Sequence, residues 1–287
     1  MILVTGATGH LGSAVINQLL KKTSVANIAA FVRDEAKAEN LKKQGVEVRV
    51  GNFDDVDSLD KALKGIEKVL IISTVDHNRF EQHKNVVDAA KKAGVKLVAY
   101  TSVTLNDLEN SAIKPLMESH FQTEDYIKQS GLAYTFYQNS LYADVIPMYI
   151  GDKVFENSEI NAPVGDGKAP YALRREMGEA IANGLSEDGH ENKSYPITNT
   201  ELYSFADVAK ALSELTGQTI AYNDIDAEAF KKGLADSGAP EEIVWLVPGF
   251  LADTKAGNFE VNTGDLEKFL GRRPADLKTA LQEIYGL

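Results

Sequence analysis

Three glycines near the amino terminus have the spacing that most clearly predicts chemistry. Gly6, Gly9 and Gly12 recur at every third position of the stretch Thr-Gly-Ala-Thr-Gly-His-Leu-Gly. The apolar run over residues 2–4 precedes them, and a helical pattern over residues 14–20 follows. A turn between a strand and a helix directs backbone N–H groups and the positive end of the helix dipole at one point, where a phosphate is stabilised. The sequence therefore predicts that this loop binds the diphosphate of a dinucleotide.

Each glycine has a separate task in such a loop. Gly6 permits the tight turn, Gly9 lets the diphosphate approach the backbone, and Gly12 lets the helix pack closely on the strand. The spacing of three residues between all the glycines is typical of short-chain dehydrogenase/reductase enzymes.

The residues after the second predicted strand indicate which dinucleotide binds. Strand 28–32 is followed by Arg33 and Asp34. A free ribose 2′-hydroxyl usually meets an acidic residue at this place, whereas a 2′-phosphate requires a cation. Arg33 therefore favours NADPH, because its planar guanidinium suits a phosphate. NADH stays open as the alternative, in which Asp34 accepts the ribose hydroxyls and Arg33 turns away into a salt bridge with Asp34 or Glu35.

Strands and helices alternate through the first half of the chain. Apolar patterns predict strands at 2–4, 28–32, 46–50, 68–73, 95–101 and 133–137, and helices at 34–44, 58–63, 80–93 and 116–129. Strands separated by helices at this interval indicate an α/β fold, a Rossmann-type doubly wound parallel sheet. Ligands bind such sheets beyond the carboxyl ends of the strands.

The pattern changes after about residue 150. Short strands are predicted at 193–198 and 219–223, helices at 204–216, 226–237, 239–246 and 277–285, and a loop or hinge at 248–258. We expect a dinucleotide-binding domain over residues 1–150 and a smaller α+β carboxy-terminal lobe over residues 151–287. The lobe should cover the carboxyl edge of the sheet and form a substrate cleft there, although the chain could cross back between the two parts.

The composition excludes several classes of protein. The 287 residues carry a net charge of −12, which disfavours binding to nucleic acid or to an anionic membrane. The absence of cysteine excludes disulfides and thiolate catalysis. The histidines show no spacing for a metal site. No secretory signal and no stretch of membrane-spanning length is evident, so we expect a cytoplasmic protein with a small-molecule partner, and a homo-oligomer stays open.

The usual catalytic pair of short-chain dehydrogenases is missing from its expected place. That pair, Tyr-x-x-x-Lys, lies on one helix face downstream of a serine. Here Ser102 follows the fifth strand, but the next helix contains no such motif, since Tyr126 is followed at the fourth place by Ser130. This departure argues against a typical alcohol dehydrogenase.

Several stretches instead resemble the NmrA-like group of that superfamily. They are residues 4–12, 89–95 (Ala-Ala-Lys-Lys-Ala-Gly-Val), Ser119-His120-x-x-x-Glu124, 130–135 and 263–272. The resemblance spans nearly the whole chain. It implies a Rossmann-type cofactor domain, a small carboxy-terminal lobe, NADPH as cofactor and a quinone as hydride acceptor.

The resemblance also implies which residues contact the cofactor. Gly12, the third glycine of the loop, is added to the contacts that the resemblance implies. The expected contacts in this sequence are Gly6, Ala7, Thr8, Gly9, His10, Leu11, Gly12, Arg33, Ser73, Thr74, Val75, Gln138, Asn139, Ser140, Leu141, Tyr142, Ala143 and Arg174. The group often carries an arginine where this chain has Gln138.

His120 is the candidate catalytic residue. Histidine titrates near neutral pH, so it could protonate the oxygen of a quinone after hydride transfer. The alternative is that His120 only packs in the protein, because water can protonate the product. The missing Tyr-x-x-x-Lys also keeps a second function open, that of a non-catalytic NmrA-like regulator that senses the dinucleotide and then binds a protein partner. An epimerase or dehydratase with bound NAD is a third interpretation, which Arg33 opposes.

Overall fold

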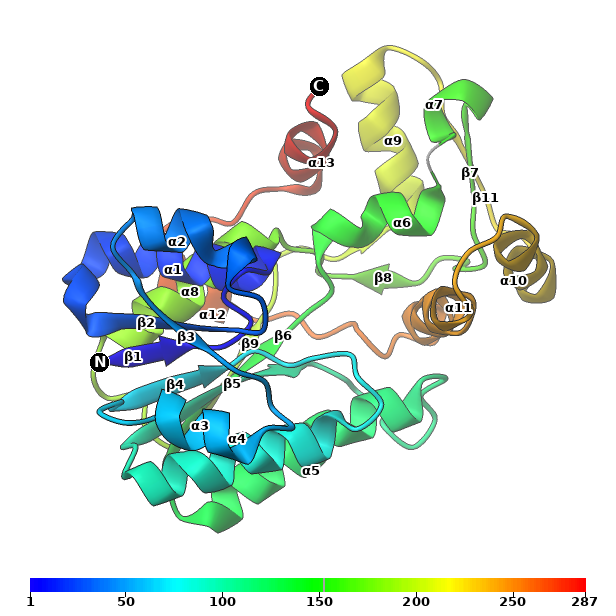
Figure 1. Ribbon diagram of the computed structural model, residues 1–287. Coiled ribbons are helices and arrows are strands. Elements are labelled where there is room, and N and C mark those ends of the chain that lie inside the picture. Colours follow the sequence, from blue (N-terminus) through cyan, green and yellow to red (C-terminus); the bar gives the residue numbers. More distant parts are fainter. Residues whose placement is uncertain (152) are drawn as a thin grey trace.

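A seven-stranded parallel sheet forms the centre of the protein. The computed structural model describes residues 1–151 and 153–287 (Figure 1). The strand order is β3-β2-β1-β4-β5-β6-β9, and every neighbouring pair in the sheet is parallel. The strands are β1 Ile2–Val4, β2 Ile28–Val32, β3 Glu47–Val50, β4 Lys68–Ile71, β5 Leu97–Val103, β6 Ala133–Asn139 and β9 Lys193–Ile197.

Helices cover both faces of this sheet. One face carries α1 (His10–Lys22), α2 (Glu39–Lys43), α8 (Arg174–Ser186) and α12 (Asp265–Leu270), and the other carries α3 (Val56–Ala62), α4 (Arg79–Ala93) and α5 (Lys114–Ser130) (Figure 1). Strands β2 and β5 are buried along their whole length. Continuous apolar strands of this kind are typical of parallel sheets, because the helices that connect parallel strands cover both faces. The α/β Rossmann-type fold predicted from the sequence is confirmed.

The two halves of the chain interlock through α8 and β9. Helix α8 packs on α1, where Gly178 approaches Ala14 so closely that an added Cβ would lie 2.5 Å from the Ala14 Cβ. Strand β9 pairs with β6 as the last strand of the main sheet. The prediction of a strand at 193–198 is thus right, but its assignment to the small lobe is wrong, because backbone pairing with β6 places it in the sheet. The division of the chain at residue 150 stays a prediction.

The remaining elements build a lobe above the carboxyl end of the sheet. They are α6 (Ile146–Ile150), α7 (Val154–Asn157), β7 (Glu159–Asn161), β8 (Lys168–Ala169), β10 (Tyr203–Ser204), α9 (Phe205–Thr216), β11 (Ala221–Asn223), α10 (Ala227–Asp236), α11 (Glu241–Lys255) and α13 (Leu277–Tyr285). Two small sheets, β10-β8 and β11-β7, tie these elements together. Their apolar side chains form a core of their own, which Val103, Ile113 and Met117 join from the side of the main sheet.

Helix α11 overturns one expectation from the sequence. Residues 248–258 were predicted as a loop or hinge, but the helix continues through Pro248 to Lys255. Val247 and Leu251 on either side of the proline are fully buried in the core of the lobe. The carboxylate of Asp253 accepts hydrogen bonds from the Ser111 hydroxyl at 2.6 Å and from the Ala112 N–H at 2.8 Å. These contacts outweigh the backbone hydrogen bond that proline removes.

Candidate functional site

The loop between β1 and α1 forms an open anion-binding site. Helix α1 begins at His10 and has no capping side chain and no acidic residue in its first turn, so its first N–H groups are not capped. Gly6 has a φ of 58°, a left-handed conformation that favours glycine. A Cβ on Gly12 would lie 2.2 Å from the carbonyl oxygen of Gly6. The close packing of helix and loop therefore requires glycine at position 12, and it leaves room for a phosphate against the backbone.

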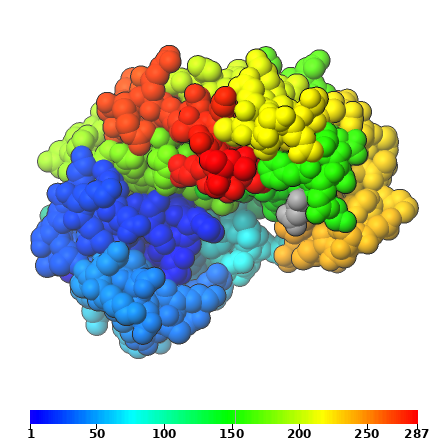
Figure 2. Space-filling view, turned by 90° about the horizontal axis from the view of Figure 1, so that it is seen from above, coloured from blue at the N-terminus to red at the C-terminus, as the bar shows by residue number. Residues whose placement is uncertain are grey.

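A cleft of about 400 Å³ extends from this loop under the lobe. The carboxyl ends of β4, β5 and β6 form one side, and residues of α6 and α11 form the other, among them Met148, Tyr149, Leu246 and Phe250. Figure 2 shows a hollow between the blue amino-terminal residues and the green and orange residues of the lobe. The cleft thus joins an anion site to an apolar chamber, as a dinucleotide with a flat, apolar substrate would require.

Three residues that line this cleft carry buried polar atoms without partners. Among the residues that the structure describes, the hydroxyls of Ser102 and Ser140 and the amide oxygen of Asn139 are buried and make no hydrogen bond. All three residues line the cleft. A buried polar atom without a partner destabilises the fold unless a ligand or water satisfies it. These atoms therefore suit the ribose and carboxamide groups of a nicotinamide nucleotide.

Arg174 lies beside the same atoms. Its guanidinium carbon lies 4.5 Å from the centre of the Tyr142 ring, and the Tyr142 hydroxyl accepts a hydrogen bond of 3.2 Å from the Asn139 amide. Stacking on an aromatic face holds an arginine in place while its N–H groups stay free for a ligand. Arg174 and Tyr142 both line the cleft.

Most of the residues expected to contact the cofactor line the cleft. The residues that do so are Gly6, Gly9, His10, Leu11, Gly12, Ser73, Thr74, Val75, Asn139, Ser140, Leu141, Tyr142 and Arg174, together with the candidate catalytic residue His120. The sequence thus predicted residues of five separate segments that the fold brings to one place. Their contacts with a cofactor stay a prediction.

Five expected contacts lie outside the cleft, four of them close to it and the fifth, Arg33, farther away. Ala7 and Ala143 are fully buried behind it, and Thr8 is exposed on the outer side of the glycine loop. The side chain of Gln138 donates a 3.0 Å hydrogen bond to the Glu124 carboxylate, because alternate residues of β6 point to opposite faces of the sheet. The Gln138 side chain therefore does not reach the cleft.

Arg33 is exposed just after β2, outside the cleft. Within the described part of the chain it makes no ion pair. Glu35 instead pairs with Lys42, and the Asp34 carboxylate accepts a 3.0 Å hydrogen bond from the Ala36 N–H. The salt bridge considered as the alternative for Arg33 is thus absent, and its guanidinium is free to meet a phosphate.

His120 on α5 is held in its neutral form. Its Nδ1 lies 2.8 Å from the Tyr100 hydroxyl, and the residue is only 6% exposed. Burial, and then the charges of Arg79 and His83, hold the pKa of His120 well below its usual value of 6.5. The ring of His120 therefore stays neutral near pH 7. It does not act there as an imidazolium acid. The neutral ring can still donate one hydrogen bond into the cleft.

Sequence reasoning missed several residues of the site. Arg79, the first residue of α4, is buried and lines the cleft, and no local pattern in the sequence singled it out. Leu246 and Phe250 were missed because the helix predicted at 239–246 was expected to give way to a loop at 248–258, whereas α11 continues to Lys255. A Tyr-x-x-x-Lys spacing does occur at Tyr149 and Lys153, outside the helix where it was sought. Helix α6 ends at Ile150, so this pair does not share a helix face; Tyr149 is buried and Lys153 is exposed.

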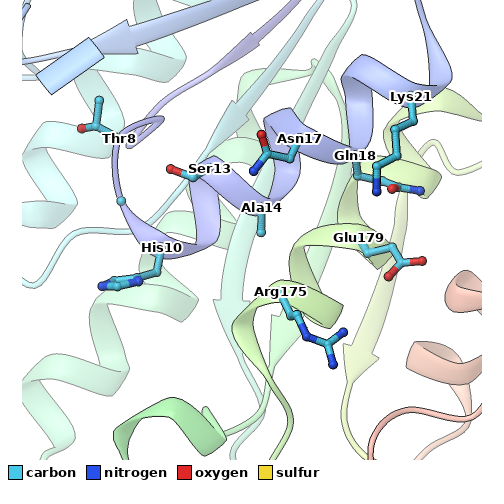
Figure 3. A pocket seen from close by; sticks show the side chains of 10 residues that line it. Thr8, His10, Ser13, Ala14, Asn17, Gln18, Lys21, Arg175 and Glu179 are labelled. Carbon is cyan, nitrogen blue, oxygen red and sulfur yellow. The ribbon is translucent and has the colours of Figure 1, made fainter. Parts of the chain in front are cut away.

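A second, polar groove runs along the outside of α1 (Figure 3). Lys21 and Gln18 of α1 face Arg175 and Glu179 of α8 across it. The Arg175 guanidinium is already paired with Glu283 at 2.6 Å. The groove touches the loop only at Thr8, Gly9 and His10, so the orphaned polar atoms of the cleft do not face it.

Two classes of site find no support in the described residues. Residues 1–151 and 153–287 hold no group of three or more histidine or acidic side chains placed to bind a metal. Over the same residues, every helix is too short or too polar to cross a membrane.

The parallel sheet, the glycine loop and the cleft together define a Rossmann-type dinucleotide-binding fold. The pattern of the NmrA-like family matches residues 1–282. The chain therefore belongs to the NmrA-like family.

Curated relatives and solved structures match over almost the full length. Quinone oxidoreductase 2 of Escherichia coli (strain K12) is 32% identical over 100% of this chain and 99% of its own. NAD(P)H azoreductase of Xenophilus azovorans is 31% identical, over 85% and 83% of the two chains. The triphenylmethane reductase of Citrobacter sp., solved with NADP(H), superposes with a TM-score of 0.92 at 36% identity, covering 99% of this chain and 100% of that one.

Proposed function

We propose that this protein is an NADPH-dependent oxidoreductase that transfers a hydride to a small quinone. One observation carries the proposal: a single cleft joins the uncapped start of α1 to an apolar chamber under the lobe. The relatives support it, since quinone oxidoreductase 2 from Escherichia coli has been solved with NADPH. When bound, NADPH supplies a hydride from its nicotinamide.

The residues of the cleft fit such a cofactor. The loop from Gly6 to Gly12 would hold the diphosphate, and Arg33 the 2′-phosphate. The orphaned atoms of Ser102, Asn139 and Ser140 would receive the nicotinamide half. The chamber lined by Tyr149, Leu246 and Phe250 would exclude water from the ring of the acceptor.

His120 would contribute a hydrogen bond rather than a proton from an imidazolium. In the tautomer in which the Tyr100 hydroxyl donates to Nδ1, the neutral ring carries its proton on Nε2 and would offer it to a ligand in the cleft. A donor at this place would orient a quinone oxygen and stabilise the charge that develops on it. Solvent would then supply the final proton.

A spectroscopic assay tests the proposed function. Purified protein is mixed with NADPH and a panel of benzoquinones and naphthoquinones, and the absorbance of the reduced nicotinamide is followed. We expect turnover, with a rate that is flat between about pH 6 and 8 because His120 stays neutral there. Tight NADPH binding without consumption would instead support the alternative function, a regulator that senses the dinucleotide.

Replacing Arg33 by alanine should change the preference between the two cofactors. We expect the KM for NADPH to rise by at least about tenfold, because a phosphate loses a charge-assisted partner, and the KM for NADH to stay within about twofold. Steady-state kinetics with both cofactors measure this. Lys37→Ala, which removes another exposed cation of the same segment, is the matched control. Equal rises in both KM values would contradict the assignment of Arg33.

A further inference from the structure

Arg79 is a buried cation that no carboxylate neutralises. The residue is 3% exposed, and its guanidinium donates to three neutral oxygens: the Ser119 hydroxyl, the Leu116 carbonyl and, at 3.0 Å, the Thr74 carbonyl. Within residues 1–151 and 153–287, it forms no ion pair with an acidic side chain. A buried charge without a counter-charge strongly destabilises a protein, so such a group is retained where a ligand uses it.

Three ionisable groups close to Arg79 are neutral at pH 7: Tyr100 on β5, His83 on α4 and His120 on α5. Asp76 and Glu242 line a neighbouring cavity with Arg79 but form no ion pair with it. Burial, followed by the charge of Arg79, lowers the pKa of His83 to about 3. Burial raises the pKa of the Tyr100 hydroxyl. No direct counter-charge therefore neutralises the positive charge of Arg79 toward a ligand in the space beside it.

That space is the apolar half of the cleft. Arg79 lines the main cleft together with Leu116 and His120, and it also lines a neighbouring cavity of about 520 Å³ that reaches Trp245 on α11. Three of its five N–H groups are used by the protein, which leaves two without a protein acceptor. A substrate in the chamber thus meets a fixed guanidinium whose charge it has to match.

We propose that Arg79 selects the acceptor by charge: it favours acceptors that become anionic on receiving a hydride and rejects cationic ones. This inference rests on the proposed function. A neutral quinone that accepts a hydride, one proton with two electrons, becomes the monoanion of a hydroquinone, while the nicotinamide is oxidised to its pyridinium form. The monoanion then takes one proton from solvent. The charge of Arg79 stabilises this anion as it forms.

A cationic acceptor has the opposite charge balance. A triphenylmethane dye, named in the description of the Citrobacter enzyme, begins as a cation. The same hydride forms a new C–H bond at its central carbon and leaves a neutral product. Beside Arg79 the cationic reactant is repelled, and its transition state, which still carries part of the positive charge, is repelled relative to the free dye. This chain should therefore discriminate against such dyes in spite of its similarity to that enzyme.

Kinetics with two acceptors of opposite charge test the proposal. For Arg79→Met and Arg79→Gln, we expect kcat/KM for 1,4-naphthoquinone to fall about 100-fold, and that for the cationic dye malachite green to stay constant or rise. Arg49→Met is the matched control: Arg49 on β3 is also anchored by backbone carbonyls, of Ala62 and Lys64, but lies outside the cleft. It should leave the ratio of the two kcat/KM values unchanged. Equal losses with quinone and dye on replacing Arg79 would overturn the proposal.

Ligand binding gives a readout that does not depend on turnover. Calorimetry compares the anion 2-hydroxy-1,4-naphthoquinone with its neutral 2-methoxy ether, on wild-type apoprotein and on Arg79→Lys. We expect both proteins to bind the anion at least about tenfold more tightly, and Arg79→Met or Arg79→Gln to lose that preference. If the wild-type protein binds the ether as tightly as the anion, the proposal is overturned, even if Arg79→Met and Arg79→Gln do not fold.

If the wild-type protein reduces no quinone, the proposed function is overturned instead. The difference in affinity between the anion and the ether would then still decide whether Arg79 selects ligands by charge.

Discussion

Replacing Gly12 by alanine is expected to weaken NADPH binding by at least about 100-fold. The new Cβ would lie 2.2 Å from the Gly6 oxygen and 2.9 Å from the Ala7 Cα, and both neighbours are backbone atoms that cannot rotate away. Relief of the clash must separate α1 from the glycine loop, which costs about 3 kcal/mol and misaligns the N–H groups that would hold the diphosphate. Calorimetric titration with NADPH measures the loss.

The control for this substitution is Gly233→Ala. Gly233 lies within α10, and a Cβ there would meet nothing within 4 Å. Alanine should therefore leave NADPH binding unchanged and stabilise the helix by up to about 1 kcal/mol. If Gly12→Ala binds NADPH as tightly as Gly233→Ala does, the loop does not bind the diphosphate.

The free energy of unfolding is expected to fall by at least about 2 kcal/mol between pH 7.5 and pH 5. His83 and His120 are buried with their pKa values lowered, that of His83 to about 3. Below pH 6.5 the unfolded chain therefore binds protons that the folded chain does not, and stability falls as the pH falls. His83 alone contributes about 2 kcal/mol of this loss at pH 5, and His120 adds to it in the same direction. Urea unfolding at a series of pH values measures it.

Substitution of His83 by phenylalanine should remove about 2 kcal/mol of that loss between pH 7.5 and pH 5. The ring position is suited to phenylalanine, because His83 packs edge-on against Tyr100 at 5.2 Å and its Nε2 has no hydrogen-bond partner. His77→Gln is the control, since His77 is exposed and its loss should leave the dependence unaltered. An unchanged slope in His83→Phe would show that protons bind elsewhere on unfolding.

Local patterns were enough to predict the sheet and the glycine loop. The strands are short apolar runs, and the turn with Gly6 and Gly12 needs glycine for reasons that involve only its neighbours in sequence. The residues of the loops after β4 and β6 were predicted from the family resemblance, and they lie where parallel strands end at one edge of the sheet. The strands and the glycine turn, by contrast, were predicted from the local sequence alone.

The features that were missed depend on distant contacts. Helix α11 continues through Pro248 because Asp253 is held by Ser111 and Ala112, which lie about 140 residues earlier. Arg79 is buried because Leu116 and Ser119 of α5 pack over it. Neither contact leaves a pattern in the local sequence. A proline and a charged residue at a helix start are both ordinary signs of an exposed segment.

The late position of β9 in the chain has a consequence for synthesis on the ribosome. When residue 150 has been made, six strands are present, but the outer edge of β6 has no neighbour until Lys193–Ile197 follows. That open edge belongs to the apolar segment Ala-Tyr-Thr-Phe-Tyr, whose backbone groups can pair with any other extended chain. The nascent protein therefore passes through an interval in which it is prone to aggregate, and shielding by a chaperone would be of most benefit there.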